Sequence, residues 1–217
     1  MINTTPIEKL KKFFSQFKTI HYRKGETLLR PGEMPQGINF LKKGYVRLYS
    51  LSYEGKDLTL VFYKPGEFFP VVWSLTGIRS VYYFEALSPV EIERASKEEF
   101  SKFINENIDV FKEVNHHIIH RFQMALKRME YLVFGNASSK LASILLICSR
   151  DFGIDTPKGK EIQIPFTHKD IAAILGVTRE TVSIELKKFE KMRFIEYNSR
   201  NIVIKDEKAL EKEAILS

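Results

Sequence analysis

The sequence predicts an α+β fold: an N-terminal antiparallel β-roll, or jelly roll, then a long helix, then a C-terminal winged helix-turn-helix. Three features carry this prediction: glycines spaced among short β-rich runs, an apolar seven-residue repeat, and two short helix patterns joined at Gly176. The expected boundaries are 1–106, 107–134 and 135–217. A chain of 217 residues, 44% hydrophobic and 28% charged, suits two modest domains of ordinary soluble composition.

The roll is predicted from the first hundred residues. After a short amphipathic helix at 6–17, glycines at 25, 32, 44, 55 and 66 separate β-rich runs. The runs expected as strands are 27–29, 39–41, 45–51, 57–63 and 81–87. A jelly roll can also hold a metalloenzyme site of the cupin type, which needs clustered histidine and carboxylate ligands. This segment contains only His21, so the sequence argues against that class of enzyme.

A single long helix is expected over 107–134, because the segment contains neither proline nor glycine before Gly135. At 1.5 Å per residue it would span about 40 Å, more than a domain of about a hundred residues needs. Packing on the chain's own roll is one interpretation, and a parallel coiled-coil homodimer is the favoured one. The predicted dimer seam consists of Phe111, Val114, Ile118, Phe122, Ala125, Met129 and Leu132.

Histidine and cysteine provide little metal-binding potential. His116, His117 and His120 stand on the long helix, but the run HHIIH lacks the glutamate of HExxH, and surface or dimer-face histidines are expected. The single cysteine, Cys148, lies in the apolar run LASILLICS, where a buried and inert thiol is predicted. One cysteine cannot supply the usual four ligands of an iron–sulfur cluster, so no such cluster is expected.

The first helix of the C-terminal pair begins with a capping box. Thr167 and Asp170 are spaced so that each side chain can accept from an unpaired N–H group of the first turn. Gly176 then allows the chain to reverse at a positive φ. The apolar side of this helix consists of Ile171, Ala172, Ile174 and Leu175.

The second helix of the pair has a buried stripe and a polar face. Thr178 is suited to cap it, and Val182, Leu186 and Phe189 fall at i, i+4 and i+7. The opposite face carries Arg179, Glu180, Ser183, Ile184 and Lys187.

An arginine and a glutamate can read guanine and cytosine edges in a DNA major groove, and an exposed isoleucine suits a thymine methyl group. The alternative is an αα-hairpin whose polar face is only solvated.

A wing is expected after the second helix. Two strand-like runs, 194–197 and 202–205, flank the turn-forming residues 198–201. Arg200 is predicted at the wing tip, where it would meet a DNA phosphate.

The charge of the chain suits a polyanionic partner, with a formal net charge of +7 and a pI near 9.3. Residues 135–217 hold 14 Lys/Arg against 12 Asp/Glu, so most of the excess lies outside the proposed DNA reader. No stretch approaches the roughly 18 apolar residues of a membrane span, and the N-terminus lacks the apolar core of a signal peptide. The sequence therefore predicts a cytoplasmic protein with no membrane partner.

Three motifs, KGETLLRPGE at 24–33, PGEFF at 65–69 and VTRETVSIELKKFEKMRFI at 177–195, resemble the Crp/Fnr superfamily of bacterial transcription regulators. The resemblance covers almost the whole chain. It implies a cyclic-nucleotide-binding-type β-roll, a dimerisation helix, and a homodimer that binds a palindromic promoter site on double-stranded DNA. It also implies contact with RNA polymerase if the protein is an activator.

The same resemblance places base-contacting residues on Arg179 and Glu180, and phosphate-contacting residues near Thr167, His168 and Thr181. Ile184 stands where the cAMP-responsive member has a second base-reading arginine, so the operator is expected to differ. The residues predicted at DNA are Thr167, His168, Thr178, Arg179, Glu180, Thr181, Ser183, Ile184, Lys187 and Arg200.

For an effector, the resemblance points to Gly66, Glu67, Arg79 and Ser80 in the roll. Two departures count against cAMP: the spacing from Glu67 to Arg79 is longer than in the family pocket, and Ala125-Leu126 replaces the Thr-Ser pair that reads adenine. The identity of an effector is therefore left open. Glu67 and Arg79 have an alternative interpretation as turn and surface residues. The apolar run 68–73 would either fill the roll or bind an apolar ligand.

The prediction for function is a DNA-binding transcription regulator without enzymatic activity. The alternative is a ligand-, metal- or haem-binding sensor protein that has no specific DNA target.

Overall fold

A computed structural model describes residues 5–198 and 201–214 of the chain. Its contacts divide the chain into two compact units, Met1–Ser50 with Leu60–Phe122 and Leu51–Thr59 with Gln123–Ser217, and each unit is treated by itself. Among the described helices, none combines the length and the apolar character that crossing a membrane requires.

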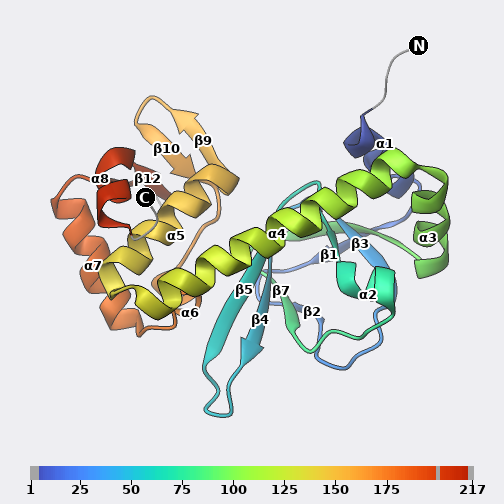
Figure 1. Ribbon diagram of the computed structural model, residues 1–217, viewed down its shortest axis with the longest axis horizontal. Helices are drawn as coiled ribbons and strands as arrows, with labels where there is room; N and C mark the ends of the chain where they lie inside the picture. Colours follow the sequence, from blue (N-terminus) through green and yellow to red (C-terminus); the bar gives the residue numbers. More distant parts are fainter. Residues whose placement is uncertain (1–4, 199–200, 215–217) are drawn as a thin grey trace. The chain divides into compact units, whose positions relative to one another are not determined.

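The N-terminal unit confirms the predicted antiparallel β-roll (Figure 1). One sheet has the strand order β1-β8-β3-β6 and the other β2-β7-β4-β5. Strands β1, β6 and β8 and helices α2 and α3 were not predicted. The elements are α1 (Pro6–Phe14), β1 (Thr19–Tyr22), β2 (Thr27–Leu29), β3 (Ile38–Lys43), β4 (Val46–Leu51), β5 (Asp57–Tyr63), β6 (Phe68–Phe69), α2 (Val71–Thr76), β7 (Tyr83–Ala86), β8 (Val90–Ala95) and α3 (Lys97–Glu106).

Two apolar clusters stabilise this unit. One contains Leu41, Phe69 and Phe84 from strands of both sheets. The other joins α1, α3 and the beginning of the long helix through residues such as Phe14 and Phe100. Phe68, Phe69 and Trp73 are all buried in these clusters, so the apolar run 68–73 fills the roll.

The long helix α4 (Ile108–Phe134) has the predicted extent but carries two apolar stripes. The first stripe consists of Val110, Val114 and Ile118, and it packs into the core of the N-terminal unit. The second stripe is exposed and recurs at spacings of three and four: Ile119, Phe122, Leu126, Met129 and Val133.

The predicted dimer seam is therefore corrected. Val114 is 2% exposed and Ile118 packs on the same core, so these two residues are covered within the single chain. Phe122 and Met129 stay on the exposed side, where both are more than 60% exposed. Apolar residues occur in adjacent pairs on this helix, such as Ile118 and Ile119, so a repeat of 3.5 residues can be drawn through either stripe. The sequence pattern alone does not show that the core of the roll covers the first stripe.

The C-terminal unit has the predicted helix-turn-helix and adds a hairpin and two helices to it. The elements are α5 (Ala137–Phe152), β9 (Gly153–Thr156), β10 (Gly159–Ile162), α6 (His168–Leu175), α7 (Arg179–Lys191), β11 (Ile195–Asn198), β12 (Asn201–Ile204) and α8 (Glu207–Glu213). The strands form a sheet in the order β11-β12-β10-β9. Helix α5 contacts α7, α8 and β10. Cys148 of α5 is buried, and burial raises the pKa of its thiol, which keeps it protonated and unreactive.

Candidate nucleic-acid interface and sensor site

Helix α6 begins and ends as the sequence predicts. Thr167 Oγ1 accepts from the Asp170 N–H at 3.1 Å, and Asp170 Oδ2 accepts from the Thr167 N–H at 2.7 Å, which is a reciprocal capping box. Gly176 ends the helix at φ 65° and ψ 33°, a left-handed conformation that side chains rarely adopt. Thr167 is therefore a structural cap as well as a predicted phosphate contact.

Helix α7 packs through the predicted stripe. Thr178 caps it by accepting from the Thr181 N–H at 3.2 Å. Val182, Leu186 and Phe189 are each 1% exposed or less. These buried side chains fix which face of α7 is turned outward.

The outward face of α7 is unoccupied by the rest of the described chain. Arg179, Glu180 and Lys187 are exposed, and their side chains make no hydrogen bond or ion pair with any described residue. Ile184 is 66% exposed. A cation, a carboxylate and an apolar side chain at the beginning of one exposed helix are the groups that read base edges in a major groove.

His168 joins α6, α7 and the wing strand β11. Its Nδ1 lies 2.7 Å from Ser183 Oγ, which itself donates to the Arg179 carbonyl oxygen at 3.0 Å. Nδ1 is therefore the donor, because the hydroxyl proton is already used, and Nε2 is left to accept from the Tyr197 hydroxyl at 3.4 Å. Burial and then the Glu190 charge raise the pKa of Tyr197 to about 12, so this hydroxyl stays protonated. His168 and Ser183 thus position the reading helix.

The base of the wing is held by one carboxylate of the neighbouring strand. Glu161 on β10 accepts from Asn201 Nδ2 and from Asn198 Nδ2, each at 2.7 Å. These hydrogen bonds from Asn201 and Asn198 lower the pKa of Glu161 below its ordinary value. Arg200, the predicted phosphate contact at the tip, lies outside the described residues.

Within the C-terminal unit, the last turns of α4 are tied to the helix-turn-helix. Arg128 donates from a terminal guanidinium nitrogen to the Ile174 carbonyl oxygen of α6 at 2.7 Å. This carbonyl is in the last turn of α6, where a cation also complements the helix dipole.

In the N-terminal unit, Glu67 is engaged by helix α4. One carboxylate oxygen lies 2.9 Å from His117 Nε2, and the other accepts from Arg121 at 2.7 Å. The Arg121 guanidinium also stands over the Tyr63 ring at 4.4 Å. The Glu67 side chain is 12% exposed, and both of its oxygens have partners, so it is not free to bind a ligand in this state. It also accepts from the Lys64 N–H at 2.9 Å, which is the turn contact of the alternative interpretation. His117, expected to be a surface or dimer-face residue, is its partner.

The other predicted effector residues have different partners. Gly66, at φ 94°, donates to the Leu41 carbonyl oxygen at 2.8 Å. Arg79 donates to the Gly32 carbonyl oxygen at 3.3 Å and is exposed. Among the described residues, Ser80 Oγ bonds to Tyr82 of its own loop alone, accepting from the Tyr82 N–H at 3.1 Å and donating to the Tyr82 carbonyl oxygen at 3.2 Å. Glu67 and Arg79 therefore do not form a shared set of contacts.

Two family models match the chain in the predicted order. The cyclic nucleotide-binding domain matches residues 19–107, and the Crp-like helix-turn-helix domain matches residues 139–213. The chain belongs to the Crp/Fnr superfamily of transcription regulators. Membership in the Crp/Fnr superfamily agrees with the roll, the long helix and the helix-turn-helix described above.

Individual relatives cover nearly the whole chain. The global nitrogen regulator of Synechocystis sp. is 28% identical over 194 residues, which make up 88% of this chain and 86% of that protein. The cAMP-activated global transcriptional regulator CRP of Pasteurella multocida is 28% identical and covers 94% of this chain and 98% of its own. A CooA mutant from Carboxydothermus hydrogenoformans has a TM-score of 0.77 at 25% identity, covering 98% of this chain and 96% of its own. FixK2 from Bradyrhizobium japonicum, with a TM-score of 0.80 at 22% identity and coverage of 93% and 98%, supports the fold alone.

The contacts of Glu67 with His117 and Arg121 make the stability of the roll depend on pH. Burial by itself would raise the pKa of Glu67, but the His117 hydrogen bond, the Arg121 charge and the Lys64 N–H together hold that pKa below its ordinary value. A carboxyl whose pKa is lowered by folding stabilises the fold above its unfolded pKa, and this contribution disappears as the pH falls through the folded pKa.

Between about pH 5 and pH 3, where imidazoles are already charged, the unfolding free energy of the wild type should therefore fall more steeply than that of Glu67→Gln. Urea unfolding at each pH measures this free energy. The fluorescence of Trp73, the only tryptophan of the chain, reports on the unit that contains Glu67. Equal slopes for the two proteins would contradict the pairing.

Proposed function

We propose that this chain works as a homodimer that binds a two-fold symmetric DNA site and regulates transcription from it. The observation that carries the proposal is the outward face of α7, where Arg179, Glu180 and Ile184 are exposed while the stripe behind them is buried. When a helix-turn-helix docks in the DNA major groove, the first residues of its second helix contact base edges. Dimers place two such helices one DNA turn apart.

The exposed stripe of α4 supports the homodimer. Ile119, Phe122, Leu126, Met129 and Val133 lie at the spacings of a heptad seam, and each is at least 47% exposed. Water-exposed apolar residues in such a continuous row are typical of an interface. A second copy of the helix would cover them.

We further propose that cAMP is not the effector. The name of the Pasteurella relative says that it is activated by cAMP. Here the carboxylate of Glu67 is already neutralised by His117 and Arg121, and α4 presents Ala125 and Leu126 without side-chain donors. The roll therefore supports a different signal or a structural role.

The remaining parts of the proposal follow from the family. A regulator of this kind works in the cytoplasm, has no enzymatic activity, and contacts RNA polymerase if it activates. Its specificity depends on side chains at DNA, since residues 135–217 carry a net charge of only +2, from 14 Lys/Arg against 12 Asp/Glu.

Selection of binding sites from a random DNA library by the purified full chain tests the proposal. We expect enrichment of one palindromic sequence, with a dissociation constant at physiological salt at least about a thousandfold lower than for scrambled DNA. No enriched sequence, together with stoichiometric metal or haem in the purified protein, would favour the alternative of a sensor without a DNA target.

A further inference from the structure

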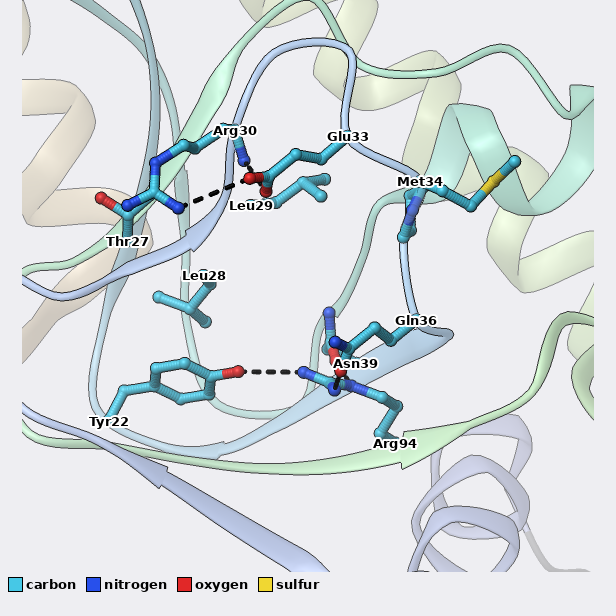
Figure 2. Close-up of a pocket in the computed structure, with 11 residues that line it drawn as sticks. Tyr22, Thr27, Leu28, Leu29, Arg30, Glu33, Met34, Gln36, Asn39 and Arg94 are labelled. Carbon is cyan, nitrogen blue, oxygen red and sulfur yellow. Dashed lines mark hydrogen bonds and ion pairs between the residues drawn. The ribbon is translucent and has the colours of Figure 1, made fainter.

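The β-roll contains a cavity of about 380 Å³ that is separate from the Glu67 turn. It lies among β1, β2, β3 and β8, and Figure 2 shows the side chains around it. Its polar lining includes Tyr22, Gln36, Asn39 and Arg94. None of Gly66, Glu67, Arg79 and Ser80 contributes to it, so the cavity belongs to neither the predicted effector residues nor the DNA reader.

Arg94 carries a charge that the described protein does not neutralise. Its Nε donates to Asn39 Oδ1 at 2.7 Å, one terminal nitrogen donates to Tyr22 Oη at 2.9 Å, and the other donates to Gln36 Oε1. All three acceptors are neutral. Among the described residues no carboxylate forms an ion pair with Arg94, and two of its five N–H groups make no protein hydrogen bond.

The acidic side chain of the cavity lining, Glu33, is already paired with Arg30, which lines the cavity as well. Glu33 accepts from the Arg30 guanidinium at 3.4 Å and from the Arg30 N–H at 2.9 Å. In Figure 2 this pair lies on the opposite side of the space from Tyr22 and Arg94, with Leu28 on the wall between them. The lining therefore has one neutral ion pair at one end and one uncompensated cation at the other.

We propose that this cavity binds a small organic carboxylate, whose acid group pairs with Arg94 and whose apolar part lies against Leu28. A planar guanidinium with hydrogen-bond donors to spare matches a carboxylate, and a charge-assisted hydrogen bond of this kind is about twice as strong as a neutral one. A phosphate dianion needs more positive charge than one arginine supplies. The volume lies within the range of small-molecule sites, about 300–1,000 Å³.

Calorimetric titration of the full chain with acetate, hexanoate and benzoate tests this site. Concentrations up to about 20 mM cover the millimolar affinities of such small ligands. We expect saturable binding of at least one carboxylate, no binding of its neutral amide, and no binding of inorganic phosphate. Binding of phosphate in place of the carboxylates would overturn the assigned ligand class, and no saturable binding of any carboxylate would overturn the site.

Variants then locate the binding. Arg94→Gln should weaken the carboxylate by about tenfold or more, because it removes a charged hydrogen-bond donor. Arg23→Gln removes the same charge from an exposed neighbour of Tyr22 that does not line the cavity, and it should bind like the wild type. Equal losses in both variants would mean a diffuse electrostatic effect and would overturn the site.

A second variant covers the case in which Arg94→Gln fails to fold. Leu28 lies on the wall of the cavity between the Arg30–Glu33 pair and Arg94, so Leu28→Trp adds bulk to the cavity without touching the Arg94 hydrogen bonds. We expect this variant to fold, as its circular dichroism spectrum shows, and to lose carboxylate binding. Full binding by a folded Leu28→Trp protein would show that the ligand sits elsewhere.

Discussion

Replacing Arg179 with alanine is expected to lower affinity for the selected operator by about 1–3 kcal/mol, and to do so through one base position. The side chain is exposed at the first residue of α7 and has no partner among the described residues, so its removal leaves the fold unchanged. Fluorescence anisotropy with the operator and with each single-base variant measures the effect. The variant protein should no longer distinguish the base pairs at the position that Arg179 reads.

Lys187→Ala is the matched control for Arg179→Ala. Lys187 is also exposed on the outward face of α7, but it lies two turns further along the helix, where phosphate contact is expected. Its loss should weaken all DNA sequences alike and make the salt dependence shallower by about one unit. If Arg179→Ala also weakened every sequence equally, Arg179 would not be a base reader.

Leu126→Glu is expected to convert the protein to a monomer and to remove most of its operator binding. Leu126 is central in the exposed stripe of α4 and is 47% exposed in the single chain. In a parallel coiled coil, equivalent seam residues of the two helices meet, so two glutamates would face one another in an apolar interface. Sedimentation velocity gives the association state, and anisotropy gives the loss of affinity.

His120→Glu provides the control for this substitution. His120 is exposed on the same helix, about a third of a turn away from Leu126 around the axis. The His120→Glu substitution introduces the same carboxylate outside the exposed stripe, so the protein should stay dimeric and bind its operator. A dimeric Leu126→Glu protein would place the interface on another surface.

The helix-turn-helix could be predicted because its signals are local. The capping box at Thr167, the left-handed Gly176 and the i, i+4, i+7 stripe of α7 each depend on residues within two helical turns. The structure places all of them as expected, including the exposed Ile184. Short-range backbone requirements therefore identify the DNA reader without any knowledge of the tertiary structure.

The contacts that sequence reasoning missed join distant parts of the chain. Glu67 and His117 are 50 residues apart, and no periodicity brings a turn of the roll to a helix that begins after it. Strand β8 (Val90–Ala95) does not alternate strictly, because Ile92 and Glu93 are both buried. It lies between β1 and β3, so both of its neighbours are far away in sequence. Arg94 on this strand is the residue that forms the end of the cavity.

Ile184 has a consequence for how recognition responds to ionic strength. Each cation that meets a phosphate releases counterions, so overall affinity falls as salt rises. An isoleucine against a thymine methyl releases none, and the preference for that base is hydrophobic in origin. With Ile184 in its proposed place at a thymine methyl, discrimination at this position is expected to stay constant with salt while total occupancy varies. On this proposal, the choice of base at this position is independent of the strength with which the site is held.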